Sequence, residues 1–123
     1  MLTGVGIDII EIDRIRKSIL RHGSHFIKKI FTQREQEYCS RYQDPVPRYA
    51  GKFAAKEAVV KALGTGFGAE VAWTDIEILH ADTGAPYPLL SPSLRERFGA
   101  AHLLISITHS REYAAAVAFL TKA

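Results

Sequence analysis

A carboxylate and an ammonium group lie four residues apart at Glu57 and Lys61, just before a Gly-x-Gly-x-Gly segment at residues 64–68. On a helix this spacing places both side chains on one side, and such a pair commonly does no more than stabilise the helix slightly. Glycines, however, let a backbone approach a phosphate closely and turn its amides towards it. A nearby lysine adds a mobile positive charge for the same anion. The combination predicts a phosphate site.

Two features of the glycine segment argue for a plain connection instead. The segment follows a predicted helix C-terminus, so the helix dipole does not favour an anion there. It also lacks the GxxxxGK[ST] order of a P-loop. The phosphate interpretation therefore depends on Glu57 and Lys61 being close by.

Asp8 is a second carboxylate of interest because it interrupts an apolar run at residues 5–10. In a strand it would share a face with Gly6 and Ile10, so it would be buried or would open into a cleft. A buried aspartate needs a hydrogen-bonding partner, a cation or a proton. Carboxylates from two separate elements, completed by phosphate oxygens and water, are a usual way to hold magnesium. Asp8 and Glu57 would suit such a site if the fold brings them together.

His109 stands at the end of a predicted strand, in the sequence Ser-Ile-Thr-His-Ser. Strand ends and loops place side chains at clefts, although a histidine in a hairpin is more often incidental. None of the five histidines falls in a Cys/His pattern typical of zinc.

The helix that must carry Glu57 and Lys61 is predicted at residues 48–63, and Gly64 suits its C-terminal cap. One continuous arc of about half its circumference is apolar and rich in alanine, which we interpret as the core face. Glu57 falls on the other half, between Phe53 and Val60. The core face consists of Ala54, Ala55, Ala58, Val59, Ala62 and Leu63.

The other elements follow from local patterns. Thr32 and Glu35 form a capping-box pattern that starts a helix, and β-branched runs indicate strands. Helices cluster early and strands late, which predicts an α+β fold with a largely antiparallel sheet and a long central helix, in one domain over residues 1–123. The further predicted elements are a strand at 5–10, helices at 11–21, 24–30 and 32–41, strands at 74–80 and 86–90, a short helix from 91, and hairpin strands at 103–108 and 113–120.

Composition limits the class of protein. At 123 residues the chain has the size of a single domain, and no run of apolar residues is long enough to cross a membrane. The first 13 residues hold three acids and no basic segment, unlike a signal peptide. A single cysteine, Cys39, cannot form an internal disulfide. We therefore expect a cytoplasmic protein without a membrane partner.

The charges are unevenly spread along the chain. Residues 1–61 hold 12 Lys/Arg against 7 Asp/Glu, which indicates an anionic partner or a solvated basic surface. A nucleic-acid-binding module would need basic residues interleaved with exposed aromatics. The late strands are poor in basic residues, so no nucleic-acid partner is predicted.

Four segments, in order, resemble the holo-acyl-carrier-protein synthases, which are the small 4′-phosphopantetheinyl transferases of fatty-acid synthesis. The central segment, FAAKEAVVKALGTG at residues 53–66, is the most specific of them. The likeness runs from about residue 4 to 120. The other segments are GVGIDI at 4–9, DIEI at 75–78 with GAP at 84–86, and SITHS at 106–110 with YAAA at 113–116.

The resemblance implies an enzyme that transfers the 4′-phosphopantetheine arm of coenzyme A to a serine of acyl carrier protein, releasing adenosine 3′,5′-bisphosphate. It implies magnesium bound by Asp8 and Glu57, with Lys61 on the reacting phosphate. It also implies a homotrimer with active sites between subunits and a helix that docks the acidic carrier protein. Coenzyme A would be bound by Lys61, Gly64, Thr65, Gly66, His109 and Ser110, and the carrier protein by Arg14, Lys17 and Arg21.

Two points stay open at this stage. The attacking serine needs a general base, and either a metal-bound water or a carboxylate such as Glu57 would serve. The acceptor would be a free carrier protein or a carrier domain within a larger synthase, because the chemistry is the same for both.

Overall fold

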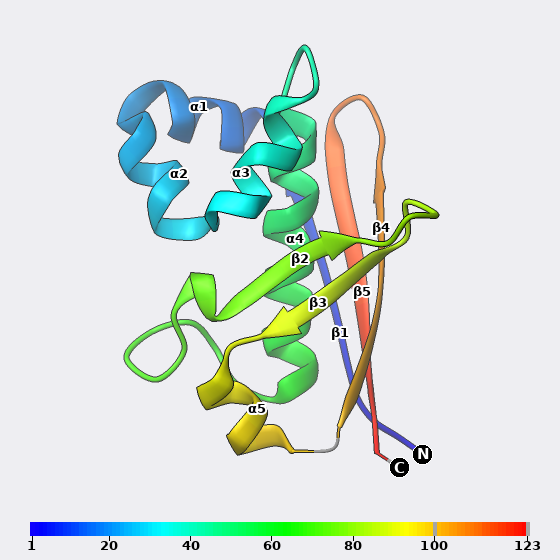
Figure 1. Ribbon diagram of the computed structural model, residues 1–123. Coiled ribbons are helices and arrows are strands. Elements are labelled where there is room, and N and C mark those ends of the chain that lie inside the picture. The colour runs from blue at the N-terminus through cyan, green and yellow to red at the C-terminus, as the bar shows by residue number, and fades with distance from the viewer. Residues whose placement is uncertain (100, 123) are drawn as a thin grey trace.

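The computed structural model describes residues 1–99 and 101–122. Its architecture is α+β, with antiparallel sheets and a long central helix, α4, as predicted (Figure 1). Helix α4 runs between the helical layer α1–α3 and a three-stranded sheet of order β1-β5-β4. The elements are β1 (Leu2–Glu11), α1 (Ile12–His22), α2 (Ser24–Ile30), α3 (Gln33–Ser40), α4 (Val46–Leu63), η1 (Trp73–Asp75), β2 (Ile76–His80), β3 (Pro86–Leu90), α5 (Pro92–Phe98), β4 (His102–His109) and β5 (Tyr113–Thr121).

Helix α4 begins with Pro47 in its first turn and ends at Gly64, whose φ of 77° is the left-handed conformation of a C-terminal cap. The predicted alanine-rich face is buried, as expected. The opposite half differs from the prediction, because Lys52, Lys56 and Val60 are buried as well. The layer α1–α3 and the β2–β3 hairpin cover that half, so α4 is enclosed on nearly all sides.

Strand β1 lies directly on α4 without a layer of side chains between them. Gly4 and Gly6 face the helix, and a Cβ atom added at either would overlap the backbone carbonyl of Ala62 or Ala58. Glycine is therefore required at both positions by close approach. Because successive strand residues alternate in direction, Asp8 faces α4 as well.

A buried ion pair joins α4 to the helical layer. Lys56 and Glu35 are both fully buried, with Nζ 2.7 Å from Oε1. The ammonium also donates to the carbonyls of Ile30 (2.6 Å) and Trp73 (3.2 Å). Glu35 in turn accepts from the amides of Thr32 and Ile78. A buried pair with all its hydrogen bonds made fixes the mutual orientation of the elements that it joins.

The predicted strand at 74–80 is shorter than expected. The amide of Ala72 donates to Asp75 Oδ2 at 2.8 Å, which closes a 3₁₀ turn at η1, and β2 starts only at Ile76. Strands β2 and β3 form a separate two-stranded antiparallel sheet.

The face of the three-stranded sheet that points away from α4 is apolar and exposed. Its large side chains include Val5, Ile7 and Ile9 of β1, Leu104 of β4 and Phe119 of β5. Ile7, for example, keeps 68% of its surface exposed. A contiguous apolar patch of this kind usually marks a contact surface. None of the helices in the described ranges is long and apolar enough to cross a membrane.

Candidate active site

Three charged side chains that the sequence analysis singled out meet where β1 crosses α4. Lys61 donates to Asp8 Oδ1 at 3.2 Å and to the Ile7 carbonyl at 2.9 Å. Glu57 lies one helical turn before Lys61, on the same side of α4. The close approach of β1 to the helix is what brings Asp8, from the start of the chain, next to this pair.

Glu57 is half-buried and close to another negative charge. Burial raises the pKa of the Glu57 carboxyl, and the negative charge of Asp8 raises it further, while Lys61 partly offsets both. Two carboxylates that share one lysine leave an excess of negative charge. Such a group favours a cation.

The donor set fits a magnesium ion. Two carboxylates supply hard oxygen ligands, and Mg²⁺ characteristically keeps several further positions for water and substrate phosphates. Within residues 1–99 and 101–122, no group of three or more His, Cys, Asp or Glu side chains could enclose a metal. Two carboxylates would leave most positions around the ion to other ligands.

The glycine loop at residues 64–68 follows directly after Lys61. The amide of Gly64 donates to the Lys61 carbonyl (3.1 Å) and that of Thr65 to the Val60 carbonyl (2.9 Å), so both are used to cap α4. The amides of Gly66 and Phe67 have no hydrogen-bond partner in the described part of the chain. They are the amides of this loop that remain available to an anion.

His109 and Ser110 lie away from this cluster within one chain. His109 ends β4, Asp8 lies in β1, and β5 separates the two strands, so they occupy opposite edges of the sheet. Two strand spacings amount to about 10 Å before any offset along the strands. The Ser110 hydroxyl is hydrogen-bonded to the Tyr113 backbone and helps close the β4–β5 hairpin.

His109 instead lines a second, cationic pocket of about 190 Å³. Arg48 and Lys52 of α4 and His80 of β2 also line it. Lys52 Nζ donates to the Ile78 carbonyl (2.6 Å) and to His80 Nε2 (3.0 Å), which assigns the proton of a neutral His80 to Nδ1, beside the Gly84 carbonyl. Burial lowers the pKa of Lys52 to about 8.

Sequence reasoning did not identify Arg48, Lys52 and His80 as site residues. The predicted helix already held Arg48 and Lys52 one turn apart, on one side, and this spacing was the available signal. What brings His80 and His109 to the same place is the packing of the β2–β3 hairpin against α4 and β4.

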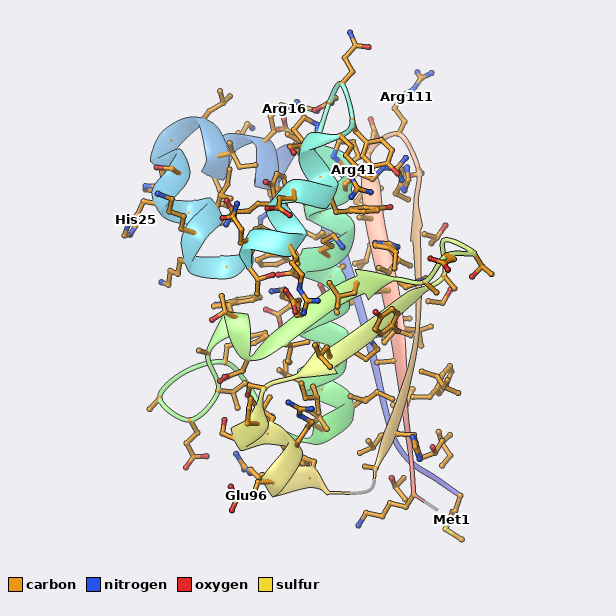
Figure 2. All side chains as sticks on the ribbon, in the orientation of Figure 1. Met1, Arg16, His25, Arg41, Glu96 and Arg111 are labelled. Atoms are coloured by element: carbon orange, nitrogen blue, oxygen red, sulfur yellow. The ribbon has the colours of Figure 1, made fainter. Side chains whose placement is uncertain are left out.

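The basic side of α1 is exposed as predicted. Arg14, Lys17 and Arg21 all face solvent, and Lys17 forms a surface pair with Asp13 at 2.9 Å. Nearby, Arg16 and Arg111 line a shallow polar pocket between α1 and the β4–β5 hairpin, and Figure 2 shows both at the same end of the molecule.

The chain is similar to known proteins over nearly its whole length. A family model described as the 4′-phosphopantetheinyl transferase superfamily matches residues 4–118. The holo-[acyl-carrier-protein] synthase of Protochlamydia amoebophila is 50% identical over 118 residues, covering 96% of this chain and 97% of that protein. The corresponding synthase of Chlamydia caviae is 54% identical over 114 residues, covering 93% of each.

Solved structures agree in fold. The holo-[acyl-carrier-protein] synthase of Neisseria meningitidis superposes with a TM-score of 0.91 at 31% identity, covering 99% of this chain and all of that one. The Helicobacter pylori synthase, solved in complex with coenzyme A, gives a TM-score of 0.88 at 35% identity, covering 95% and 99%.

Proposed function

Since the chain belongs to the 4′-phosphopantetheinyl transferase superfamily, we propose that it transfers the 4′-phosphopantetheine arm of coenzyme A to a serine of apo acyl carrier protein, in fatty-acid biosynthesis. The observation that carries this proposal is the meeting of Asp8, Glu57 and Lys61, at positions that match the motifs of the family. Cys39 is a buried free thiol, which fits a reducing compartment such as the cytoplasm.

Asp8 and Glu57 would hold the magnesium ion. When bound, the ion would neutralise negative charge on the pyrophosphate of coenzyme A. Burial is the main cause of the raised pKa of Glu57, and the negative charge of Asp8 adds to it; a divalent cation between the two carboxylates would offset both.

Lys61 would act on the phosphate that reacts. The serine hydroxyl gives its proton to the general base, its oxygen forms a bond to the phosphorus that carries pantetheine, the bond from that phosphorus to the bridging oxygen breaks, and adenosine 3′,5′-bisphosphate leaves. Negative charge then collects on the departing oxygen, and the Lys61 ammonium would stabilise it. Half of the Lys61 side chain is exposed, so it can move from Asp8 to a bound phosphate.

The two cationic regions suit the two phosphate-bearing positions of the coenzyme A nucleotide. The free amides of Gly66 and Phe67 follow Lys61 closely in the chain, and the pyrophosphate would bind between them and the lysine. The pocket at His109 holds the fixed charges of Arg48 and Lys52 and suits a further phosphate of the same molecule. In one chain these regions lie apart, because Lys52 and Lys61 are about 14 Å from each other along α4, whereas both phosphate groups belong to one nucleotide.

This separation supports active sites between subunits, as in the homotrimer that the family resemblance implies. In such an assembly, Asp8, Glu57 and Lys61 of one subunit would meet His109 of the partner subunit. The exposed apolar sheet face, to which Ile7 contributes, would supply the contact. One chain alone would then contain two halves of two different sites.

The carrier protein would dock on the basic side of α1. Carrier proteins of this type are acidic, and Arg14, Lys17 and Arg21 present positive charge on one exposed side of the helix. Charges at the rim of an interface mainly raise the rate of encounter.

A direct assay tests the proposed function. The protein is incubated with coenzyme A, magnesium and apo acyl carrier protein, and mass spectrometry measures the added arm. Transfer should occur, and EDTA should abolish it. A carrier protein that stays unmodified under all magnesium concentrations would refute the proposal.

A further inference from the structure

The backbone conformation of the glycine loop at residues 64–68 does not require glycine at every glycine position. Gly64 needs a positive φ, but Gly66 and Gly68 do not. A Cβ atom added at Gly66 or Gly68 would meet no other atom within 4 Å. Glycine widens the range of conformations that a chain samples, and beyond the helix cap the described residues tie this loop by one main-chain hydrogen bond, from the Gly68 amide to the Val71 carbonyl at 2.9 Å. Its position must be fixed by contacts outside the glycines.

A stack of three aromatic rings supplies those contacts. Phe67, from the middle of the loop, stacks on Trp73 with ring centroids 3.8 Å apart and an interplanar angle of 16°. Trp73 in turn stacks on Phe53 at 4.9 Å and 26°. Phe53 belongs to α4, one turn before Glu57. The stack thus joins the loop to the helical turn that carries the carboxylate.

Trp73 itself is held independently of the loop. Its carbonyl accepts a hydrogen bond from Lys56, whose ammonium is buried against Glu35. The 3₁₀ turn η1 that contains Trp73 is closed by Asp75. The backbone of Trp73 is therefore fixed without the loop, and its indole offers Phe67 a surface that does not depend on the neighbouring glycines.

We infer that Trp73 is a positioning residue for the transfer reaction. It would hold Phe67, and through it the free amides of Gly66 and Phe67, at a constant place beside Lys61. Trp73 would not touch the substrate. This inference rests on the proposed function, in which the loop binds the pyrophosphate of coenzyme A.

Enzyme kinetics test the inference with three variants of the full chain. Trp73→Leu should raise KM for coenzyme A roughly three- to tenfold, the range that an aromatic contact corresponds to, while kcat changes less than about twofold. Trp73→Phe retains a ring and should restore most of the affinity. Phe98→Leu, at a partly buried aromatic of α5 outside the stack, should leave KM unchanged. A wild-type KM in folded Trp73→Leu would overturn the inference.

Fluorescence gives a second test that does not depend on Trp73→Leu folding. Trp73 is the only tryptophan of the chain, so its emission reports on the stack. Coenzyme A should change that emission in the wild type, and Phe67→Leu should weaken both the change and the affinity for coenzyme A. Unaltered affinity in Phe67→Leu would also overturn the inference.

The two proposals fail in different ways. If the wild-type protein transfers no arm to carrier protein, the proposed function fails. If the wild type is active and the stack variants match it in KM and fluorescence response, only the positioning role fails.

Discussion

The Lys61 ammonium lies 3.2 Å from the Asp8 carboxylate, although 53 positions separate the two residues in the chain. This contact exists because β1 rests directly on α4. Together with Glu57, the pair forms a group with two negative charges and one positive charge. Burial, together with the negative charge of Asp8, explains why the carboxyl pKa of Glu57 is raised despite the lysine beside it.

The contact between β1 and α4 predicts different outcomes at two glycines. Gly6→Ala would place a methyl group onto the Ala58 carbonyl, and should destabilise the fold by about 1–3 kcal/mol or more and abolish transfer. Gly66→Ala has open space and should fold normally. Urea unfolding and the transfer assay measure both effects. Equal stability of the two variants would contradict the close approach.

Removing the charge of Glu57 should raise the stability of the fold slightly and abolish transfer activity. Its folded-state pKa is raised, so its contribution to stability is complete below the ordinary pKa and is lost as pH rises through the raised value. Glu57→Gln should thus be slightly more stable than wild type at neutral pH without metal, by less than about 1 kcal/mol after solvent screening.

The same variant should have lost transfer activity, which extra magnesium would restore only in part. Glu37→Gln, at an exposed position of α3, is the matched control and should change neither the stability nor the transfer activity. Full activity in Glu57→Gln would remove Glu57 from the metal site.

Lys52 predicts a pH dependence of stability with a defined sign. Its pKa is about 8 in the folded protein instead of 10.5, so the unfolded chain binds more protons between these values and stability rises with pH. Between about pH 7.5 and about pH 9 the gain should be about 1 kcal/mol.

Urea unfolding at both pH values, compared between wild type and Lys52→Met, isolates this contribution because the other titrating groups are shared. Affinity for coenzyme A should move in the opposite direction, since the pocket loses a positive charge as Lys52 deprotonates. A rise in stability that persists in Lys52→Met would assign it to another group.

A charge on the exposed sheet face should dissociate the proposed trimer. Ile7→Glu would bury an unpaired carboxylate in the subunit contact, which costs several kcal/mol. Sedimentation velocity should show monomers, and activity should fall at least about tenfold because each site needs two subunits. Leu89→Glu, on β3, is the control and should remain assembled. A trimeric and active Ile7→Glu would exclude this face as the interface.

Reversing the charge of Arg14 should affect one substrate only. Arg14→Glu should raise KM for carrier protein, most strongly at low salt, and leave coenzyme A binding unchanged. Arg95→Glu makes the same charge change on α5 and should have little effect. Equal losses for both substrates in Arg14→Glu would argue against docking on α1.

The periods of a helix and of a strand were enough to predict those parts of the site that lie on a single element. Helix period placed Glu57 and Lys61 on one side of α4, and strand alternation placed Asp8 on the same face as Gly6. Both predictions are confirmed. The two-residue and 3.6-residue periods are properties of the backbone, so they need no knowledge of the remaining fold.

Interactions between distant elements could not be predicted in the same way. The burial of Lys56 depends on Glu35, which lies 21 residues away and reaches it only after α3 packs on α4. Likewise, a hairpin was predicted for β4 and β5, but the pattern does not say that β5 lies in the middle of the sheet. That strand order is what separates His109 from Asp8.

The main-chain contact at Gly4 and Gly6 also bears on how this protein could be redesigned. At Gly4 and Gly6 the backbone of β1 packs on that of α4 with no side chain between them. The spacing of the Asp8 and Glu57 carboxylates therefore does not depend on how the hydrophobic residues elsewhere are arranged. A designer could vary the apolar interior widely, for heat resistance or for solubility, while keeping these two glycines. The reacting groups would then retain their separation in every such variant.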